Sequence, residues 1–304
     1  MQHLISVVIV NYNGVRWLER CLSSLGAQTY RSFEIILVDN ASTDDSCTLV
    51  SKNFPNVILI KSATNVGFAA GNNLGIRAAK GDAIATLNTD TLVEADYLEK
   101  LSVPLYTSPR IGACAPLMLE MEHPDIVDAA GLRVDRFGLA WNIGAGQRAE
   151  WFQTGGEVYG ACAGAALYQR AMLDEIGLFD DDYFGFYEDA DLAWRARRAG
   201  WKTMFVPAAK VYHQHGASFG KIAPRKTYLL ARNRWWTILK NYPMPSLLIH
   251  LPLIAALDSI SLIQATQRGH FREAWRGRRD AWRGRKLMLA KRLALPSPSS
   301  SRGG

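Results

Sequence analysis

The sequence has few cysteines, and none of them pairs in a way that would bind zinc or cross-link a small fold. Four occur in 304 residues, without a CxxC pair, and each lies more than 20 residues from the next. No secretory leader is evident at the start of the chain, so we expect a reducing compartment and neither a zinc knuckle nor a disulfide scaffold. With 48% hydrophobic and 21% charged residues, the chain can form a sizeable core, which excludes a disordered or fibrous protein.

Two common nucleotide-binding motifs are absent as well. The first apolar run is not followed by GxGxxG, and GxxxxGK[ST] occurs nowhere in the chain. These glycine-rich loops hold phosphates in dinucleotide-dependent dehydrogenases and in P-loop enzymes. We therefore expect neither class of enzyme.

Positive charge is concentrated near the C-terminal end. The chain has 35 Lys and Arg against 28 Asp and Glu, but residues 268–304 hold 11 of the basic residues and two of the acidic ones. The terminal segment therefore carries +9, and the first 267 residues carry −2. Since the basic excess does not belong to the main body of the chain, we expect no nucleic-acid partner.

Short apolar runs alternate with helical patterns over the first 90 residues. Four of these runs are predicted strands: 4–10, 34–38, 57–60 and 83–87. Such alternation predicts an α/β fold, with a mostly parallel sheet flanked by helices. Ligands of open sheets bind outside the carboxyl ends of the strands, where Asn11, Asp39 and Asp90 are expected to lie.

Several polar residues suit a catalytic site, although each has a simpler explanation. Asp90 could bind Mg²⁺ or Mn²⁺ together with substrate phosphates, or it could cap the next helix. Asp189 and Asp191 lead a predicted helix that ends in arginines, a distribution that helix-dipole complementarity alone explains. Arg232 could bind an oxyanion through its guanidinium or lie on an amphipathic helix surface.

Two further patterns leave alternatives open. Gly67, Gly71 and Gly75 would form a bare stripe on a helix, which permits close packing on the sheet or close approach of a nucleotide. His213 and His215 would lie on one face of a strand, but no third ligand with zinc-like spacing follows. We expect one of the two histidines to assist a metal ion that is held mainly by carboxylate.

The segment 246–265 is strongly apolar but is interrupted by His250, Pro252 and Asp258. These interruptions make it a poor bilayer-spanning helix. With the arginines that follow, it suits an interfacial helix with cationic anchors for anionic lipid. A helix pair packed on the main domain is the alternative.

Eight motifs follow one another in a fixed order: VVIVNYNG (7–14), VDNASTDD (38–45), NVGFAAGNN (65–73), LNTD (87–90), GACAGAALYQR (160–170), FYEDADLAWRARRAG (186–200), HxxGxS (213–218) and RNRWW (232–236). Together they resemble the inverting glycosyltransferases of family 2, most closely the rhamnosyltransferase-like branch. The resemblance extends from residue 4 to about residue 245 and implies a GT-A fold, a Rossmann-like α/β sheet, with amphipathic helices following it.

The resemblance also implies site residues. Asp189 matches the catalytic base, and Asp90 and His213 match the positions that bind Mg²⁺ or Mn²⁺. Asp39 matches a contact to a pyrimidine base, and Asn88 replaces the first acid of the usual DxD motif. The implied donor-binding residues are Asn11, Asp39, Asn40, Gly67, Asn72, Asn88 and Arg232, and possible acceptor-site residues are Gly164, Glu188 and Asp191.

By this resemblance the chain transfers a sugar, preferably L-rhamnose from dTDP-rhamnose, to a hydroxyl of a cell-surface glycan or a lipid-linked glycan. A UDP-sugar is the alternative donor. The expected location is cytoplasmic, peripheral at the inner face of the cell membrane and in contact with anionic lipid. A non-catalytic, membrane-associated binding protein of the same fold is the alternative from another class, since Asn88 replaces a metal ligand.

Four regions follow from this interpretation. Residues 1–110 form the nucleotide-sugar-binding half of the GT-A domain, and 111–245 form its acceptor-binding and catalytic half. Residues 246–292 form an apolar and basic helical segment that associates with membranes. Residues 293–304 are expected to be a disordered tail.

Overall fold

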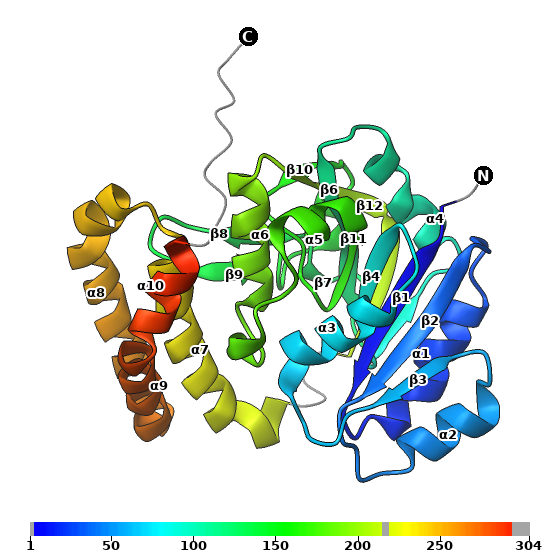
Figure 1. Ribbon diagram of the computed structural model, residues 1–304, viewed down its shortest axis with the longest axis horizontal. Helices are drawn as coiled ribbons and strands as arrows, with labels where there is room; N and C mark the ends of the chain where they lie inside the picture. The colour runs from blue at the N-terminus through cyan, green and yellow to red at the C-terminus, as the bar shows by residue number, and fades with distance from the viewer. Residues whose placement is uncertain (1–2, 215–218, 294–304) are drawn as a thin grey trace.

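One mixed sheet forms the centre of the molecule (Figure 1). The structure, a computed structural model, describes residues 3–214 and 219–293, without the side chains of 219–222 and 293. The hydrogen-bonded path through the sheet is β10-β12-β6-β11-β4-β1-β2-β3, with β5 paired to β12 and β7 to β6. The strands of this sheet are β1 (Ile5–Asn11), β2 (Phe33–Asp39), β3 (Ile58–Lys61), β4 (Ala83–Asn88), β5 (Thr91–Val93), β6 (Ile111–Glu120), β7 (Val127–Ala129), β10 (Gly156–Val158), β11 (Ala165–Gln169) and β12 (Lys202–His213).

The first four strands confirm the predicted parallel sheet. β1 pairs in parallel with β2 and β4, and β2 pairs in parallel with β3. Asn11 is in register with Asp39, and Asn88 with Val10, so the polar strand ends meet at one edge as predicted. Continuous β-branched and apolar runs form these strands because both of their faces are buried.

The later strands extend the same sheet. β11 is antiparallel to both β4 and β6, whereas β12 is parallel to β6. Along the path, only β11 and β10 therefore run against the direction of the others. A separate hairpin of β8 (Leu132–Val134) and β9 (Ala140–Asn142) projects beside the sheet. The fold is thus the mostly parallel α/β sheet that the sequence predicts.

Helices cover both faces of the sheet. Val7 and Ile9 of β1 pack into the core beneath α1, α2 and α4, whereas Val8 packs into a second core with α3, α5 and α6. The alternation follows from the strand period of two residues. These helices are α1 (Val15–Gly26), α2 (Ser46–Asn53), α3 (Gly67–Ala78), α4 (Tyr97–Ser102), α5 (Arg170–Ile176) and α6 (Glu188–Arg198), and single 3₁₀ turns occur at η1 (Pro104–Tyr106), η2 (Ala149–Trp151) and η3 (Asp181–Tyr183).

The glycine stripe of α3 faces the sheet. A Cβ at position 71 would lie 2.8 Å from Val10 Cγ1, and one at position 75 would overlap Val8. Gly71 and Gly75 therefore serve close packing of α3 on β1. Gly67 differs, since its φ of +88° is a conformation that other residues rarely adopt. Its missing side chain leaves room for the backbone and ring of Phe184.

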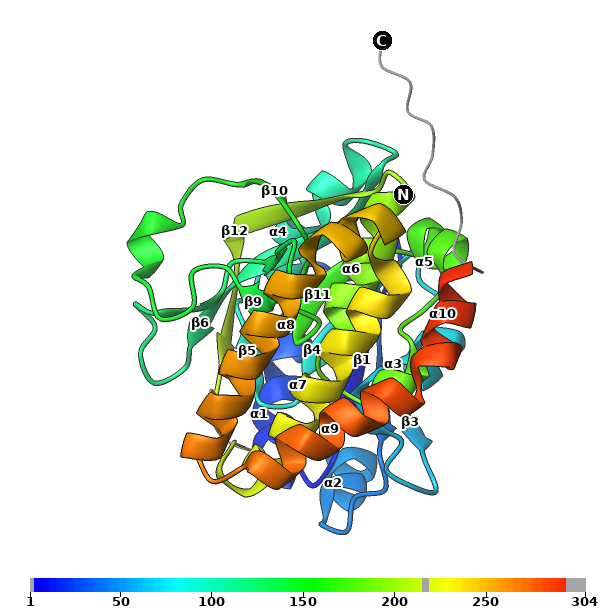
Figure 2. The same cartoon turned by 90° about the vertical axis from the view of Figure 1, so that its left-hand side faces the viewer.

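Four helices follow the sheet and pack together beside α6, on the side of the molecule away from β3 (Figures 1 and 2). They are α7 (Phe219–Asn241), α8 (Met244–Gln267), α9 (Phe271–Arg283) and α10 (Arg285–Leu293). α9 is amphipathic as predicted, with Ala274 and Ala281 buried and Trp275 and Trp282 exposed. The predicted disordered tail comprises residues 293–304. Residue 293 is the last residue of α10, and residues 294–304 lie outside the described part of the chain.

Helix α8 has two different faces. Leu247, Ile254 and Ala265 are buried against the neighbouring helices, whereas Leu248 and Ile249 are exposed. In the described ranges, one helix is long and apolar enough to cross a membrane by length and composition, and it is Met244–Gln267. Of its most apolar 18-residue window, 11% is buried. The helix thus packs on the domain through one side and leaves an apolar surface on the other.

Candidate active site

Two adjoining cavities open at the carboxyl ends of the parallel strands. The strand-end cavity, of about 350 Å³, is lined by residues at and just after the ends of β1 and β4 and at the start of α3, among them Tyr12 and Asp90. The central cavity, of about 530 Å³, extends to α6, β12 and the β8–β9 hairpin and is lined by Asp189 and His213. Asn88 lines both cavities. The two spaces form one crevice, which joins the first strands to the later half of the chain.

Asn11 and Asp39 are buried at the edge of this crevice. Asn11 Nδ2 donates to Asp39 Oδ1 at 3.1 Å and to Ser42 Oγ at 3.0 Å, and the Ser42 amide donates to Asp39 Oδ2 at 3.1 Å. The carboxylate thereby fixes the loop that follows β2. Asn11 Oδ1 is buried without a hydrogen-bond partner among the described residues, and neither Asn11 nor Asp39 lines a cavity directly.

Asn40 ties this loop to the start of α3. Its Nδ2 donates to Asn65 Oδ1 and to the Gly67 carbonyl, and its Oδ1 accepts the Val66 amide at 2.9 Å. The side chain is therefore occupied in shaping the wall of the strand-end cavity. Asn72 is buried on α3 and donates to the Phe68 carbonyl, and it lines neither cavity. The side-chain amide of Asn72 is thus used within α3, and its expected contact with the donor stays a prediction.

Asp90, His213 and Asp128 form a chain of contacts across the crevice. His213 Nε2 lies 3.3 Å from Asp90 Oδ1, and His213 Nδ1 lies 2.8 Å from Asp128 Oδ2. Burial would lower the pKa of His213, but the hydrogen bonds to the two carboxylates outweigh burial and raise it to about 10. Asp90 does not cap the following helix, since β5 intervenes and α4 starts after Asp96.

Asp90 and His213 offer the oxygen and nitrogen ligands that a divalent cation needs when it also binds a diphosphate. Among the described residues no group of three or more His, Cys, Asp and Glu side chains could hold a metal ion. Mg²⁺ and Mn²⁺ bound beside substrate phosphates need one or two protein ligands, with phosphate and water completing the shell. Asp90 fits that need, and His213 Nε2 fits it when a bound metal ion displaces the proton from that nitrogen. His215 lies outside the described residues.

Asp189 is the second residue of α6 and lines the central cavity. Its Oδ1 accepts the amide of Ala190 at 2.8 Å. Burial raises the pKa of Asp189, although backbone hydrogen bonds from Ala190 and Ala163 oppose the rise. A carboxylate whose pKa is raised toward neutrality is a better proton acceptor. The position and the environment of Asp189 both suit a general base.

Glu188 and Gly164 also line the central cavity. Burial raises the pKa of Glu188 well above its ordinary value, and the neighbouring Asp189 adds to this rise. Glu188 Oε2 has no hydrogen-bond partner in the part of the chain that is described. At Gly164 a Cβ would lie 3.0 Å from Asn88 Nδ2, so the glycine makes room for the Asn88 side chain.

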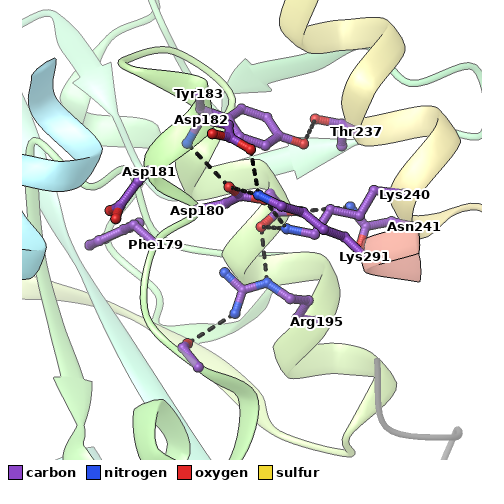
Figure 3. Close-up of polar contacts among 12 residues, drawn as sticks. Phe179, Asp180, Asp181, Asp182, Tyr183, Arg195, Thr237, Lys240, Asn241 and Lys291 are labelled. Atoms are coloured by element: carbon purple, nitrogen blue, oxygen red, sulfur yellow. Dashed lines mark hydrogen bonds and ion pairs between the residues drawn. The ribbon is translucent and has the colours of Figure 1, made fainter. Parts of the chain in front are cut away.

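Asp191 lies on the opposite side of α6 and does not reach the crevice. It is fully buried, and its Oδ2 is 2.9 Å from Arg195 Nε and 2.9 Å from Lys240 Nζ. In Figure 3, Lys240 of α7 and Lys291 of α10 converge on Asp180, which belongs to the same cluster. Asp191 is therefore not an acceptor-site residue. Because a helix rotates by about 100° per residue, positions 189 and 191 of α6 point to different sides: Asp189 to the central cavity and Asp191 to the ion pairs.

Arg232 does not line either cavity, contrary to its expected contact with donor phosphate. Its Nη2 donates to the carbonyls of Asp182 and Tyr183, both at 2.9 Å, so the guanidinium holds the turn before α6. The cations that do line the strand-end cavity are Arg225 and Lys226, one to two turns earlier on α7. Burial lowers the pKa of Lys226.

The loop between this turn and α6 is strained. Phe184, Phe186 and Tyr187 all have φ between +64° and +71°, which is unfavourable for aromatic residues. Asn233, fully buried on α7, donates from Nδ2 to the carbonyls of Tyr183, Gly185 and Phe186 at 2.7 to 3.0 Å. One amide thus holds the strained loop that presents Phe186 to both cavities.

Sequence reasoning missed Asp128, Lys226 and Asn233. No local pattern marks Asp128, since it meets His213 only through the pairing of β6 with β7 and β12. Asn233 is part of the motif RNRWW, but nothing in that motif indicates that its side-chain amide donates hydrogen bonds to backbone carbonyls. Lys226 follows a stretch without periodic pattern, and only the course of α7 brings it to the crevice.

Sequence comparison finds glycosyltransferases that are similar to this chain. The family model described as Glycosyl transferase family 2 matches residues 6–177. The N-acetylglucosaminyl-diphospho-decaprenol L-rhamnosyltransferase of Mycobacterium tuberculosis is 28% identical over 268 residues, which cover 78% of this chain and 87% of that protein. An uncharacterized glycosyltransferase of Bacillus subtilis is 28% identical over 234 residues, which cover 74% of this chain and 81% of that one.

Solved structures share the fold at lower identity. GalNAc-T7 with UDP, GalNAc and Mn²⁺ superposes with a TM-score of 0.63 at 19% identity, over 78% of this chain and 48% of that chain. A mannosyltransferase of Pyrobaculum calidifontis in complex with GDP-Man and Mn²⁺ has a TM-score of 0.59 at 17% identity, over 96% of this chain and 84% of that chain. Both support a GT-A fold.

Proposed function

Since the chain belongs to glycosyl transferase family 2, we propose that it transfers L-rhamnose from dTDP-rhamnose to a hydroxyl of a lipid-linked glycan, with inversion at the anomeric carbon. The observation that carries this proposal is the central cavity, where Asp189 and His213 line one space. The rhamnosyl donor and the lipid-linked acceptor take their support from the Mycobacterium tuberculosis relative, whose name states both a rhamnosyl transfer and a diphospho-decaprenol acceptor.

The donor nucleotide belongs in the strand-end cavity. Asn11 and Asp39 are buried behind its wall, next to the lining residues Tyr12 and Asn40, and Arg225 and Lys226 line it and bring positive charge. Guanidinium and ammonium groups stabilise phosphate oxygens through charge-assisted hydrogen bonds. The diphosphate would then lie beside Asp90, and the sugar would point through the opening at Asn88 into the central cavity.

In the central cavity Asp189 accepts the proton of the acceptor hydroxyl. The hydroxyl oxygen forms a bond to the anomeric carbon while the bond from that carbon to the diphosphate breaks on the opposite face. No nucleophile of the enzyme is needed, so a single displacement inverts the configuration. A Mg²⁺ or Mn²⁺ ion held by Asp90 and His213 would supply Lewis-acid stabilisation of the departing diphosphate.

The C-terminal helices support a peripheral location at a membrane, and the cytoplasmic face is the one that the family resemblance implies. α8 exposes Ile249 and Leu253, and α9 exposes Trp275 and Trp282, beside the arginines of the basic segment. Exposed apolar and indole side chains next to arginines are typical of helices that lie in a lipid interface. Asp258 of α8 is paired with arginines of α7 and α9, which favours an interfacial position over a membrane-spanning one.

The proposal is tested with donor hydrolysis and transfer by wild type and Asp189→Asn. With dTDP-rhamnose and Mg²⁺ or Mn²⁺, wild type should release dTDP, and EDTA should stop the release. Asp189→Asn should bind donor with nearly unchanged affinity by calorimetry and lose about 10²- to 10⁴-fold in transfer. The control Asp181→Asn, outside both cavities, should retain activity. Equal turnover of wild type and Asp189→Asn would refute the assignment, and release confined to UDP-sugars would refute the donor.

A further inference from the structure

A third cavity, of about 240 Å³, lies between α7, α8, α9 and the β8–β9 hairpin. It shares Ala140, Tyr187 and Leu230 with the central cavity, so the same side chains form a wall of both spaces. Tyr187 directly precedes α6, the helix that carries Asp189. The third cavity therefore adjoins the side of the central cavity on which the acceptor is expected.

The third cavity is positively charged. Arg234, Arg268 and Arg278 line it, and the one carboxylate among its lining residues is Asp258. Asp258 is engaged by two of these arginines: its Oδ2 accepts Arg278 Nε at 2.7 Å, and its Oδ1 lies 3.3 Å from Arg234 Nη1. One carboxylate is thus set against three guanidinium groups, which leaves the cavity with a net positive charge.

Arg234 has a buried donor that the protein does not use. Its side chain is 5% exposed, and its Nη2 donates to the Phe137 carbonyl at 3.0 Å. Its Nε has no hydrogen-bond partner among the described residues. Leaving a buried charged donor unpaired is unfavourable, so the protein does not fully satisfy the guanidinium of Arg234.

The mouth of the third cavity lies beside the apolar face of α8. Ser261, Gln264 and Arg268 line the cavity and are exposed, so it opens to solvent along the last turns of the helix. Ile260 and Ile263 point to the outer side of the same turns and are 50% and 57% exposed. A ligand in the cavity can therefore keep a polar group inside and a hydrocarbon chain along α8.

We propose that the third cavity binds the diphosphate of a lipid-linked acceptor, with the acceptor sugar in the central cavity beside Asp189 and the lipid chain leaving along α8. The inference rests on the proposed function, because it takes the acceptor to be a lipid-linked sugar. A diphosphate diester carries two negative charges, which match the excess of three arginines over Asp258. Guanidinium groups bind phosphate oxygens in bidentate geometry.

The test compares Arg268→Gln with Arg272→Gln. Both arginines are exposed, but Arg272 does not line the cavity, so the two variants lose the same charge. The acceptors are N-acetylglucosaminyl diphosphate carrying a farnesyl chain and octyl N-acetylglucosaminide, which has no phosphate. For the diphosphate acceptor, Arg268→Gln should raise KM about tenfold or more and leave kcat close to wild type. The octyl acceptor and Arg272→Gln should show no such change.

A binding measurement separates this inference from the proposed function. Farnesyl diphosphate is titrated into the protein with saturating dTDP and Mn²⁺, so that the donor site is filled. Binding by wild type that weakens about tenfold in Arg268→Gln, but not in Arg272→Gln, supports the cavity even if no rhamnosyl transfer is found. Absence of binding by wild type, or equal effects of both variants, would overturn it.

A lipid headgroup is the other source of phosphate, and vesicles distinguish it. Phosphatidylglycerol vesicles should bind Arg268→Gln and Arg272→Gln equally well, since each variant loses one surface charge. If Arg268→Gln weakens vesicle binding more than its control while KM for the diphosphate acceptor stays unchanged, the cavity serves the bilayer and the inference is wrong.

Discussion

Replacement of Lys240 by methionine removes one cation from the buried cluster behind α6. Methionine keeps most of the side-chain volume but leaves Asp191, which is fully buried, with Arg195 as its remaining cationic partner. Asp180 keeps Lys291, which is 30% exposed. Breaking a buried ion pair by removing one partner costs about 3 to 5 kcal/mol. We expect a loss of that size in the free energy of unfolding at pH 7.

The pH dependence of this loss has a definite sign. Burial alone would raise the pKa of Asp191, but Lys240 and Arg195 lower it to about 2. Against an unfolded value of about 3.9, the shift stabilises the folded chain by roughly 2 to 3 kcal/mol above pH 4, and this is lost as the pH falls toward 2. The difference between wild type and Lys240→Met should therefore narrow over the same interval.

The assay is urea unfolding followed by tryptophan fluorescence, because Trp236 packs edge-on against Tyr183, whose ring lies 5.7 Å from Lys240 Nζ. The control is Lys100→Met, which breaks an exposed i,i+4 pair with Asp96 and should cost about 0.5 kcal/mol or less. If Lys240→Met stays within 1 kcal/mol of wild type at pH 7, or if its deficit grows as the pH falls, the account of the cluster is wrong.

Two further predictions concern the crevice. Asp128→Asn should weaken Mn²⁺ binding in the presence of nucleoside diphosphate by about 10- to 100-fold, because the carboxylate orients His213 through Nδ1. A Mn²⁺ titration followed by electron paramagnetic resonance measures this affinity. The prediction is contradicted if Asp128→Asn binds Mn²⁺ as tightly as the exposed control Asp125→Asn does. Asn233→Ala should lower the free energy of unfolding by about 1 to 3 kcal/mol, because the buried carbonyls of the 183–186 loop lose their donor. Urea unfolding checks the second prediction, and an unchanged midpoint would show that the loop does not need this amide.

The α/β architecture was readable from the sequence because local patterns determine it. Continuous apolar runs form buried strands wherever helices cover both faces, and helical spacing marks α1 through Leu18, Leu22 and Leu25. The polar ends of β1 and β2 could be placed together because parallel strands bring their carboxyl ends to one edge. The motif order then pointed to Asp90, Asp189 and His213, all of which line the crevice.

Directions of side chains across helices were not readable in the same way. Asp189 and Asp191 are two residues apart in one acidic motif, yet Asp189 lines the central cavity and Asp191 is buried against Lys240 and Arg195. A helix turns by about 100° per residue, so neighbours in sequence face different surroundings. The packing of α7 and α10 determines which of these two aspartates points toward the cavity.

The sequence by itself determined the sheet, the polar strand ends and the residue types available for glycosyl transfer, since these depend on local periodicity and short motifs. Only the tertiary structure decided that Asp128 supports His213 from 85 positions away, that Arg232 donates to the carbonyls of the turn before α6, and that α7, α8 and α9 enclose a cationic cavity. Such contacts join segments far apart in the chain, and their geometry is set by the packing of whole elements rather than by the residues beside them in sequence.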